Sequence, residues 1–144
     1  MHTSDELLQQ AGLRVTRPRL AVLEALRTHP HADVAELLRL TREDSAAVSV
    51  QGVYDVLTTL SEAGVLRRIQ PASSPARFEL ELGDNHHHAV CRSCHTIVDV
   101  PCSTGLAPCL DATAVTRQGF TAEEAEVIYW GLCPDCQIRP TPMK

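Results

Sequence analysis

The chain is poor in aromatic residues, has no excess of positive charge and contains no long hydrophobic run. Aromatic side chains make up 3% of its 144 residues, so its cores are expected to consist mainly of Leu, Val and Ala. The net charge of −5 argues against a generally polybasic nucleic-acid binder but leaves room for local basic clusters. Residues 1–14 hold no run suited to a signal peptide, and no later run could span a bilayer. We therefore expect a soluble, cytoplasmic protein without a membrane anchor.

Four of the six cysteines form two C-x-x-C pairs, Cys91/Cys94 and Cys133/Cys136. In a reducing compartment, such cysteines indicate metal or redox chemistry rather than a disulfide framework. Each C-x-x-C turn presents two sulfurs on one side, and tetrahedral zinc takes four thiolates. The intervening residues 95–132 exceed the roughly 15–20 residues of a minimal zinc ribbon, so they are expected to contain a strand, a helix and a strand. The pairs predict a structural Zn(II) site; a thioredoxin-like redox pair is the alternative, without a recognisable strand-to-helix context.

A histidine triplet precedes the first cysteine pair. On a strand, His86 and His88 project from one face and His87 from the other, so a second metal site separate from the thiolates is predicted. Carboxylates lie nearby in sequence, at Glu79, Glu81, Asp84 and Asp99. Imidazoles and carboxylates without thiolate suit Fe(II) or Mn(II) and also admit Zn(II). A solvated polar histidine run is the alternative.

The remaining histidines and cysteines carry weaker signals. His2, His31 and His95 are expected at the surface. Cys102 and Cys109 fit neither thiol pair. Three interpretations stay open for them: inert residues, a regulatory disulfide pair or extra metal ligands.

The pattern of apolar residues and breakers predicts an α+β chain in two parts. Residues 1–82 read as several helices, including one capped by Thr16, one over 33–40 and one over 49–64, followed by extended runs over 65–69 and 77–82. Helices followed by a hairpin is the order of a winged helix-turn-helix. After a hinge at 83–85, residues 86–138 form a metal-binding domain with strands expected over 86–91, 96–100 and 126–132 and a weak helix over 106–118. Residues 139–144 are a tail.

The helix over 49–64 is the candidate recognition helix. It carries Gln51 and Tyr54 in its early part, where Gln can pair with adenine and Tyr can contact phosphate or a thymine methyl. Arg14, Arg17 and Arg19 suit phosphate contacts. An ordinary surface helix and a solvated arginine face are the alternatives.

Taken together, these motifs resemble the ferric uptake regulator (Fur) family over nearly the whole chain. The matching segments are Leu13-Arg14-Val15-Thr16-Arg17-Pro18-Arg19, His29-Pro30-His31-Ala32-Asp33, Val53-Tyr54-Asp55-Val56-Leu57, Arg77-Phe78-Glu79, Asp84-Asn85-His86-His87-His88 and both C-x-x-C pairs. A finer similarity to the actinobacterial FurA/CatR-type peroxide-responsive repressors, which are linked to catalase genes, rests on Tyr54-Asp55-Val56-Leu57, Ala107-Pro108-Cys109-Leu110 and Ile128-Tyr129-Trp130-Gly131-Leu132-Cys133-Pro134-Asp135-Cys136.

The resemblance implies a homodimer with an N-terminal winged-helix DNA-binding domain (1–82) and a C-terminal α/β dimerisation domain (86–138). It also implies a regulatory metal site with ligands from both domains, which fall on His29, Glu79, His86, His88 and Asp99. Many members have a further metal site, to which His87 would belong; its other partners are left open. The position after the recognition tyrosine is often Arg or Asn and is Asp55 here, so the operator sequence is expected to differ.

These observations predict a metal-dependent repressor rather than an enzyme. Metal and operator DNA would bind with reciprocal linkage. With Fe(II) bound, peroxide is expected to oxidise His29 or His86 and relieve repression of oxidative-stress (catalase) or iron-homeostasis genes. Iron- or manganese-responsive repression without peroxide sensing is the alternative. A metallohydrolase at the histidine–carboxylate site is another alternative. The sequence has no H-E-x-x-H motif, however, and this hypothesis does not account for the winged-helix region. A thiol switch at Cys102 and Cys109 is a further possibility.

Overall fold

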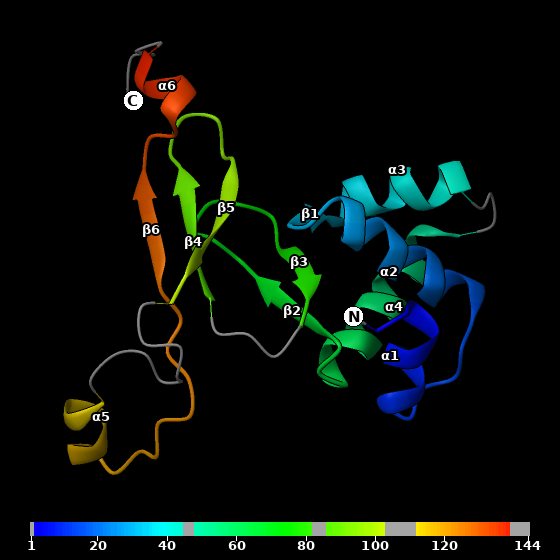
Figure 1. The fold of residues 1–144 in the computed structure, drawn as a ribbon, viewed down its shortest axis with the longest axis horizontal. Helices are drawn as coiled ribbons and strands as arrows, with labels where there is room; N and C mark the ends of the chain where they lie inside the picture. The colour runs from blue at the N-terminus through cyan, green and yellow to red at the C-terminus, as the bar shows by residue number, and fades with distance from the viewer. Residues whose placement is uncertain (1, 45–47, 82–85, 103–111, 139–144) are drawn as a thin grey trace. The chain divides into compact units, whose positions relative to one another are not determined.

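A computed structural model describes residues 2–44, 48–81, 86–102 and 112–138 of the chain (Figure 1). The chain divides into two compact units, Met1–Leu82 and Gly83–Lys144. Each unit has a three-stranded sheet of its own. The hinge expected at 83–85 and the tail expected at 139–144 lie outside the described residues.

The first unit is a group of helices followed by a small sheet. In chain order its elements are α1 (Ser4–Gln10), α2 (Arg17–Thr28), β1 (Ala32–Asp33), α3 (Val34–Asp44), α4 (Val50–Glu62), β2 (Leu66–Ile69) and β3 (Arg77–Leu80). The sheet has the order β1-β3-β2, and both pairings are antiparallel. The predicted helices and hairpin are therefore present, and β1 adds a strand that was not expected.

Helix α4 has clear start and stop signals. Ser49 lies at its N-cap, and the Ser49 hydroxyl accepts a hydrogen bond from the backbone N–H of Gly52 at 2.9 Å. That bond satisfies one of the donors that every helix N-terminus leaves without an intrahelical partner. Gly64 follows the C-cap with a φ of 77°, in the left-handed region where glycine carries no Cβ penalty. Helix α2 is capped in the same way by Thr16, as predicted.

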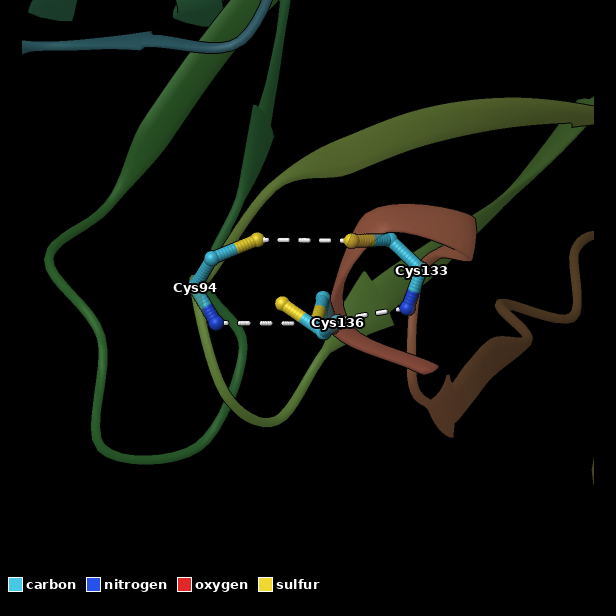
Figure 2. A group of neighbouring side chains, drawn as sticks. Cys94, Cys133 and Cys136 are labelled. Atoms are coloured by element: carbon cyan, nitrogen blue, oxygen red, sulfur yellow. Dashed lines mark hydrogen bonds between the residues drawn. The ribbon is translucent and has the colours of Figure 1, made fainter. Parts of the chain in front are cut away.

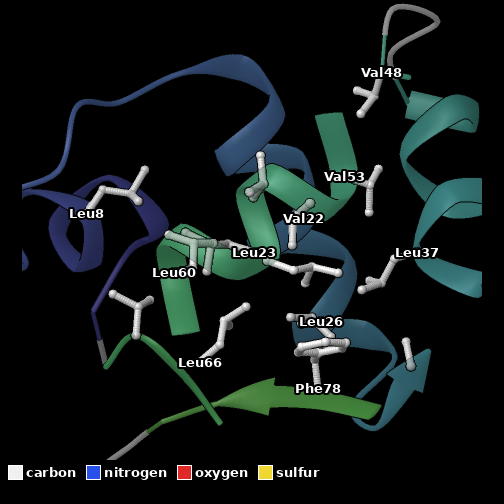
Figure 3. Close-up of a cluster of buried hydrophobic side chains, with 14 residues drawn as sticks. Leu8, Val22, Leu23, Leu26, Leu37, Val48, Val53, Leu60, Leu66 and Phe78 are labelled. Carbon is white, nitrogen blue, oxygen red and sulfur yellow. The ribbon is translucent and has the colours of Figure 1, made fainter. Parts of the chain in front are cut away.

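The core of the first unit consists of aliphatic side chains with one aromatic ring (Figure 3). Val22, Leu23 and Leu26 of α2 meet apolar side chains of α4 and of the sheet in one buried cluster. Burial of such side chains contributes roughly 1.5–3 kcal/mol each and fixes the faces of the helices. Because α4 buries Val53 and Leu60, its opposite face is presented to solvent.

The second unit is built on one mixed sheet. Its elements are β4 (His86–Cys91), β5 (Ile97–Pro101), α5 (Thr113–Arg117), β6 (Ile128–Gly131) and α6 (Pro134–Ile138). The sheet order is β5-β4-β6, with β4 antiparallel to β5 and parallel to β6. The three predicted strands are present. Helix α5 covers the end of the helix expected over 106–118, whose residues 106–111 lie outside the described part, and α6 was not predicted.

The α+β fold class is confirmed by this arrangement of a helical unit with a small sheet and a second unit with a mixed sheet. Within the described ranges, no helix is both long and apolar enough to cross a membrane.

Candidate metal centres and nucleic-acid interface

The four cysteines of the two C-x-x-C pairs come together at one end of the second sheet. Cys91 ends β4 and lies in register with Gly131 of the neighbouring strand β6. Because the two strands run parallel, the chain leaves both in the same direction, into the turn with Cys94 and into the segment with Cys133 and Cys136 (Figure 2). The parallel pairing thus brings together two thiol pairs that lie far apart in sequence.

The geometry of the cysteine cluster fits a tetrahedral ion. The four sulfurs all lie within 4.8 Å of one another, and the Sγ atoms of Cys94 and Cys133 are 3.7 Å apart. A tetrahedron with Zn–S bonds of about 2.3 Å has sulfur–sulfur edges of about 3.8 Å. The four thiols are free of disulfides. They could therefore hold a zinc ion with little rearrangement.

Hydrogen bonds stabilise the thiolate form of two of these cysteines. The backbone N–H groups of Cys94 and Cys133 point at Cys91 Sγ at 3.5 and 3.4 Å and lower the pKa of the Cys91 thiol to about 6. The Thr96 hydroxyl lies 3.0 Å from Cys94 Sγ and lowers the pKa of Cys94. The neighbouring Cys133 thiol raises the pKa of Cys136. Thiolate is the form that binds metal, so these hydrogen bonds favour the ligating form of Cys91 and Cys94.

A second group of metal-binding side chains lies on β4 and β5. His86 and His88 project from the same face of β4, with ring centroids 5.0 Å apart. Asp99 is the cross-strand partner of His88, and its Oδ1 lies 3.5 Å from the Nε2 atoms of both histidines. His87 lies on the opposite face of β4 and is buried. Two imidazoles and one carboxylate of the predicted set therefore converge.

The first unit brings Glu79 together with a histidine, but that histidine is His31 and not the predicted His29. His31 Nε2 lies 3.3 Å from Glu79 Oε2, and both residues are buried. The expectation that His31 lies at the surface was therefore wrong. His29 is at the C-cap of α2, where its Nδ1 lies 2.8 Å from the Thr28 hydroxyl.

The position of His31 follows from the strand that the sequence did not predict. Its backbone N–H donates to the carbonyl of Phe78 on β3 at 3.0 Å, and its own carbonyl accepts from Arg77 Nη1 at 3.3 Å. Its φ of 71° is a left-handed conformation that costs a non-glycine residue about 1–2 kcal/mol. Strain of this kind concentrates at functional positions, which favours a ligand role for His31.

The predicted DNA-contacting side chains of α4 face solvent. Gln51 is exposed and Tyr54 is 50% exposed. Gln51 Nε2 donates a hydrogen bond to Asp55 Oδ1 at 2.8 Å. The arginines at the start of α2 and just before it differ from one another. Arg14 and Arg17 are exposed, whereas Arg19 uses Nη1 to donate to the Arg14 carbonyl at 2.7 Å. The Arg19 guanidinium is thus already engaged in a hydrogen bond to the segment that precedes α2.

The second sheet also carries exposed apolar side chains. Val98 and Tyr129 lie in register on either side of Ala89, and they are 51% and 54% exposed. Apolar side chains side by side on an open sheet face are typical of an interaction surface. Cys102 lies outside the cysteine cluster, and Cys109 lies outside the described residues, so the suggested pairing of these two stays a prediction.

The fold and these groups define a winged-helix protein with metal-binding side chains, and comparison with known proteins assigns its family. The model of the ferric uptake regulator family matches residues 10–128. The transcriptional regulator FurA of Mycobacterium tuberculosis is 58% identical over 136 residues, which are 94% of this chain and 91% of that protein. Ferric uptake regulation protein 2 of Mycolicibacterium fortuitum is 52% identical over 139 residues, with 94% of both chains covered.

Solved structures agree with this assignment. The ferric uptake regulator of Pseudomonas aeruginosa with manganese superposes with a TM-score of 0.67 at 25% identity, covering 92% of this chain and 99% of that one. The ferric uptake regulator of Francisella tularensis shares the fold, with a TM-score of 0.72 over 88% of this chain and 96% of that one. The chain belongs to the ferric uptake regulator family. Its relatives are transcriptional regulators and not enzymes, so the metallohydrolase alternative is not favoured.

Proposed function

We propose that the chain is a metal-dependent, peroxide-sensing transcriptional repressor that binds double-stranded operator DNA as a homodimer. The observation that carries this proposal is a thiolate-free group of donors, His86, His88 and Asp99, in a chain whose four clustered cysteines suffice for a structural ion. A second group of harder donors suits a regulatory ion that differs from the structural one.

The cysteine cluster is proposed to hold Zn(II) permanently. Structural zinc contributes its binding free energy to folding, and the second unit, with one small sheet and short helices, gains most from such an ion. The Thr96 hydroxyl and the backbone N–H groups on Cys91 would stabilise the thiolates.

The regulatory ion is proposed to be Fe(II) or Mn(II), ligated by His86, His88, Asp99, Glu79 and a histidine of the 29–33 segment. Imidazole and carboxylate donors suit these ions, whereas thiolates would favour zinc. Within the histidine segment we now propose His31 as the ligand, because it is His31 that meets Glu79. Metal that binds the DNA-competent conformation more tightly raises DNA affinity by the same factor.

DNA contact is proposed for the exposed face of α4, with Gln51 and Tyr54 toward base edges and Arg14, Arg17 and Arg19 toward phosphates. The exposure of Gln51, Tyr54, Arg14 and Arg17 supports this, and so does the position of α4 in a winged-helix unit. The exposed Val98 and Tyr129 support association of two chains through the second sheet. Two copies would present two recognition helices to successive major grooves.

Peroxide sensing rests on the similarity to FurA/CatR-type repressors. Bound Fe(II) would supply the electrons that reduce peroxide, and the product of that reaction would oxidise a nearby imidazole. An oxidised histidine is a poorer ligand, so the metal and then the DNA would be released. Mn(II) would support repression without this response, and the genes controlled are proposed to serve oxidative stress or iron homeostasis.

The test measures operator binding by the zinc-loaded protein, with fluorescence anisotropy as the readout and under anaerobic conditions. Added Fe(II) or Mn(II) is expected to raise affinity for the operator about 5- to 150-fold, the usual range of allosteric coupling. Low peroxide should then reverse binding with Fe(II), add oxygen mass to a histidine, and leave the Mn(II) complex intact. Equal loss with both metals, reversed by dithiothreitol, would contradict histidine oxidation and favour the thiol switch. Retained binding with Fe(II) after peroxide would favour the iron-responsive alternative.

A further inference from the structure

The exposed face of α4 carries a pair of side chains joined to each other. Gln51 and Asp55 are one helical turn apart, and Gln51 Nε2 donates to Asp55 Oδ1 at 2.8 Å. A carboxylate only accepts hydrogen bonds, so the amide nitrogen and not the amide oxygen of Gln51 must face Asp55. The bond therefore fixes the orientation of an amide that would otherwise be free to flip. The glutamine presents one defined hydrogen-bonding pattern to solvent.

The groups left over by this bond match the edge of one base. Gln51 keeps one amide proton and its Oε1 atom, and adenine in the major groove offers the complementary pair, an N7 acceptor and an N6 donor. Asp55 keeps its second oxygen, which can only accept. Cytosine offers a single donor in the major groove, its N4 amine. Guanine O6 and thymine O4 are acceptors and would oppose the carboxylate.

The charge of Asp55 restricts what it can face. A carboxylate near a phosphate is repelled, so the helix can enter a groove only with Asp55 directed toward the base edges. Val50 and Tyr54, which each precede a member of the pair by one residue, are 48% and 50% exposed. Side chains at i and i+4 lie about 5–6 Å apart. Base pairs stack about 3.4 Å apart, so Gln51 and Asp55 would reach base pairs that are adjacent or separated by one other base pair.

We propose that Gln51 and Asp55 form one reading unit of the recognition helix, with Gln51 selecting adenine and Asp55 selecting cytosine one or two base pairs away. This inference rests on the proposed DNA-binding function and specifies part of its operator. It assigns to Asp55 a specificity role that a phosphate-binding side chain at that position could not perform. The hydrogen bond makes the two preferences interdependent, because each side chain orients the other.

The experiment is selection of operator sequences from a randomised DNA library by the full-length, zinc- and Mn(II)-loaded protein. The wild-type protein should enrich half-sites with an adenine and a cytosine at that spacing. Asp55→Asn should lower the cytosine preference about tenfold, the size of one good base contact, since an amide both donates and accepts. Gln51→Ala should remove the adenine preference and also weaken the cytosine preference, because Asp55 loses its orienting partner. Glu62→Gln, which removes an exposed carboxylate from the same helix, is the matched control and should enrich the wild-type sequence.

The outcomes separate this inference from the proposed function. Enrichment of a metal-dependent operator whose base preferences are the same in Asp55→Asn and in the wild-type protein would overturn the inference alone. A cytosine preference untouched by Gln51→Ala would overturn the claim that the pair acts as one unit. Failure of the wild-type protein to enrich any sequence would overturn the proposed function and the inference together.

Discussion

At the scale of single residues, the choice between neighbouring histidines depends on backbone geometry. His29 ends α2 and contacts Thr28, whereas His31 is held by hydrogen bonds to β3 in a left-handed conformation that places its ring against Glu79. Both have the same chemistry and nearly the same place in the sequence. Only one of them meets a buried carboxylate, and that one is the better candidate for a ligand.

His31→Ala is therefore expected to reduce the metal-dependent gain in DNA affinity more than tenfold, because loss of even an outer-shell partner costs about 10–100-fold in metal affinity. His29→Ala, the matched control, should behave as the wild-type protein. Anisotropy titrations with Mn(II) measure both, and circular dichroism checks that each variant is folded. The reverse pattern, with His29 essential and His31 dispensable, would return the ligand role to His29.

The local parts of the candidate sites were predictable from sequence, and the non-local part was not. The spacing within each C-x-x-C pair and the alternation of a strand place Cys91 with Cys94, and His86 with His88, from a few consecutive residues. The choice of His31 depends on the pairing of Ala32 with Phe78, which lies far along the chain. No pattern in the immediate sequence specifies such contacts.

At the scale of elements, strong local signals predicted the helices and strands that position the sites. Helix α4 has a capping serine, apolar residues at helical spacing and a terminal glycine, and it forms where these signals place it. Strand β1 has two residues, which is too short for any alternation to be seen. Helix α6 is five residues long and follows from the turn around the second cysteine pair. Short elements of this kind are set by their neighbours.

The cap of α4 makes a measurable contribution to its stability. Ser49→Ala removes the acceptor for the Gly52 N–H and is expected to cost about 1 kcal/mol, which is about fivefold faster hydrogen exchange in the first turns of α4. Ser61→Ala is the matched control on the same helix, since its hydroxyl has no hydrogen-bond partner within the described ranges. Exchange measured by mass spectrometry should separate the two. An equal effect of both substitutions would contradict the capping role.

At the scale of the whole molecule, the two units are stabilised in different ways. The first has an aliphatic core of helices and a sheet, whereas the second has one small sheet and a cluster of four thiols. A small domain that buries little apolar surface is only marginally stable by itself. The second unit is therefore expected to depend on zinc and the first is not.

Cys133→Ser should accordingly release zinc and abolish exchange protection in β4, β5 and β6, while α2 and α4 stay protected. Cys102→Ser is the control, because Cys102 lies outside the cluster of four. Zinc analysis and hydrogen exchange on the same samples give both readouts. A zinc-free Cys133→Ser protein with native protection in all three strands would show that the ion is not structural.

The central claim is linkage between the regulatory metal and DNA, and a closed thermodynamic cycle tests it most directly. The Mn(II) affinity of the zinc-loaded protein is measured with and without operator DNA, and the DNA affinity with and without Mn(II). Linkage requires that DNA raise the metal affinity by the same factor by which metal raises the DNA affinity, about 5- to 150-fold. A metal affinity that is unchanged by saturating operator DNA would contradict the account.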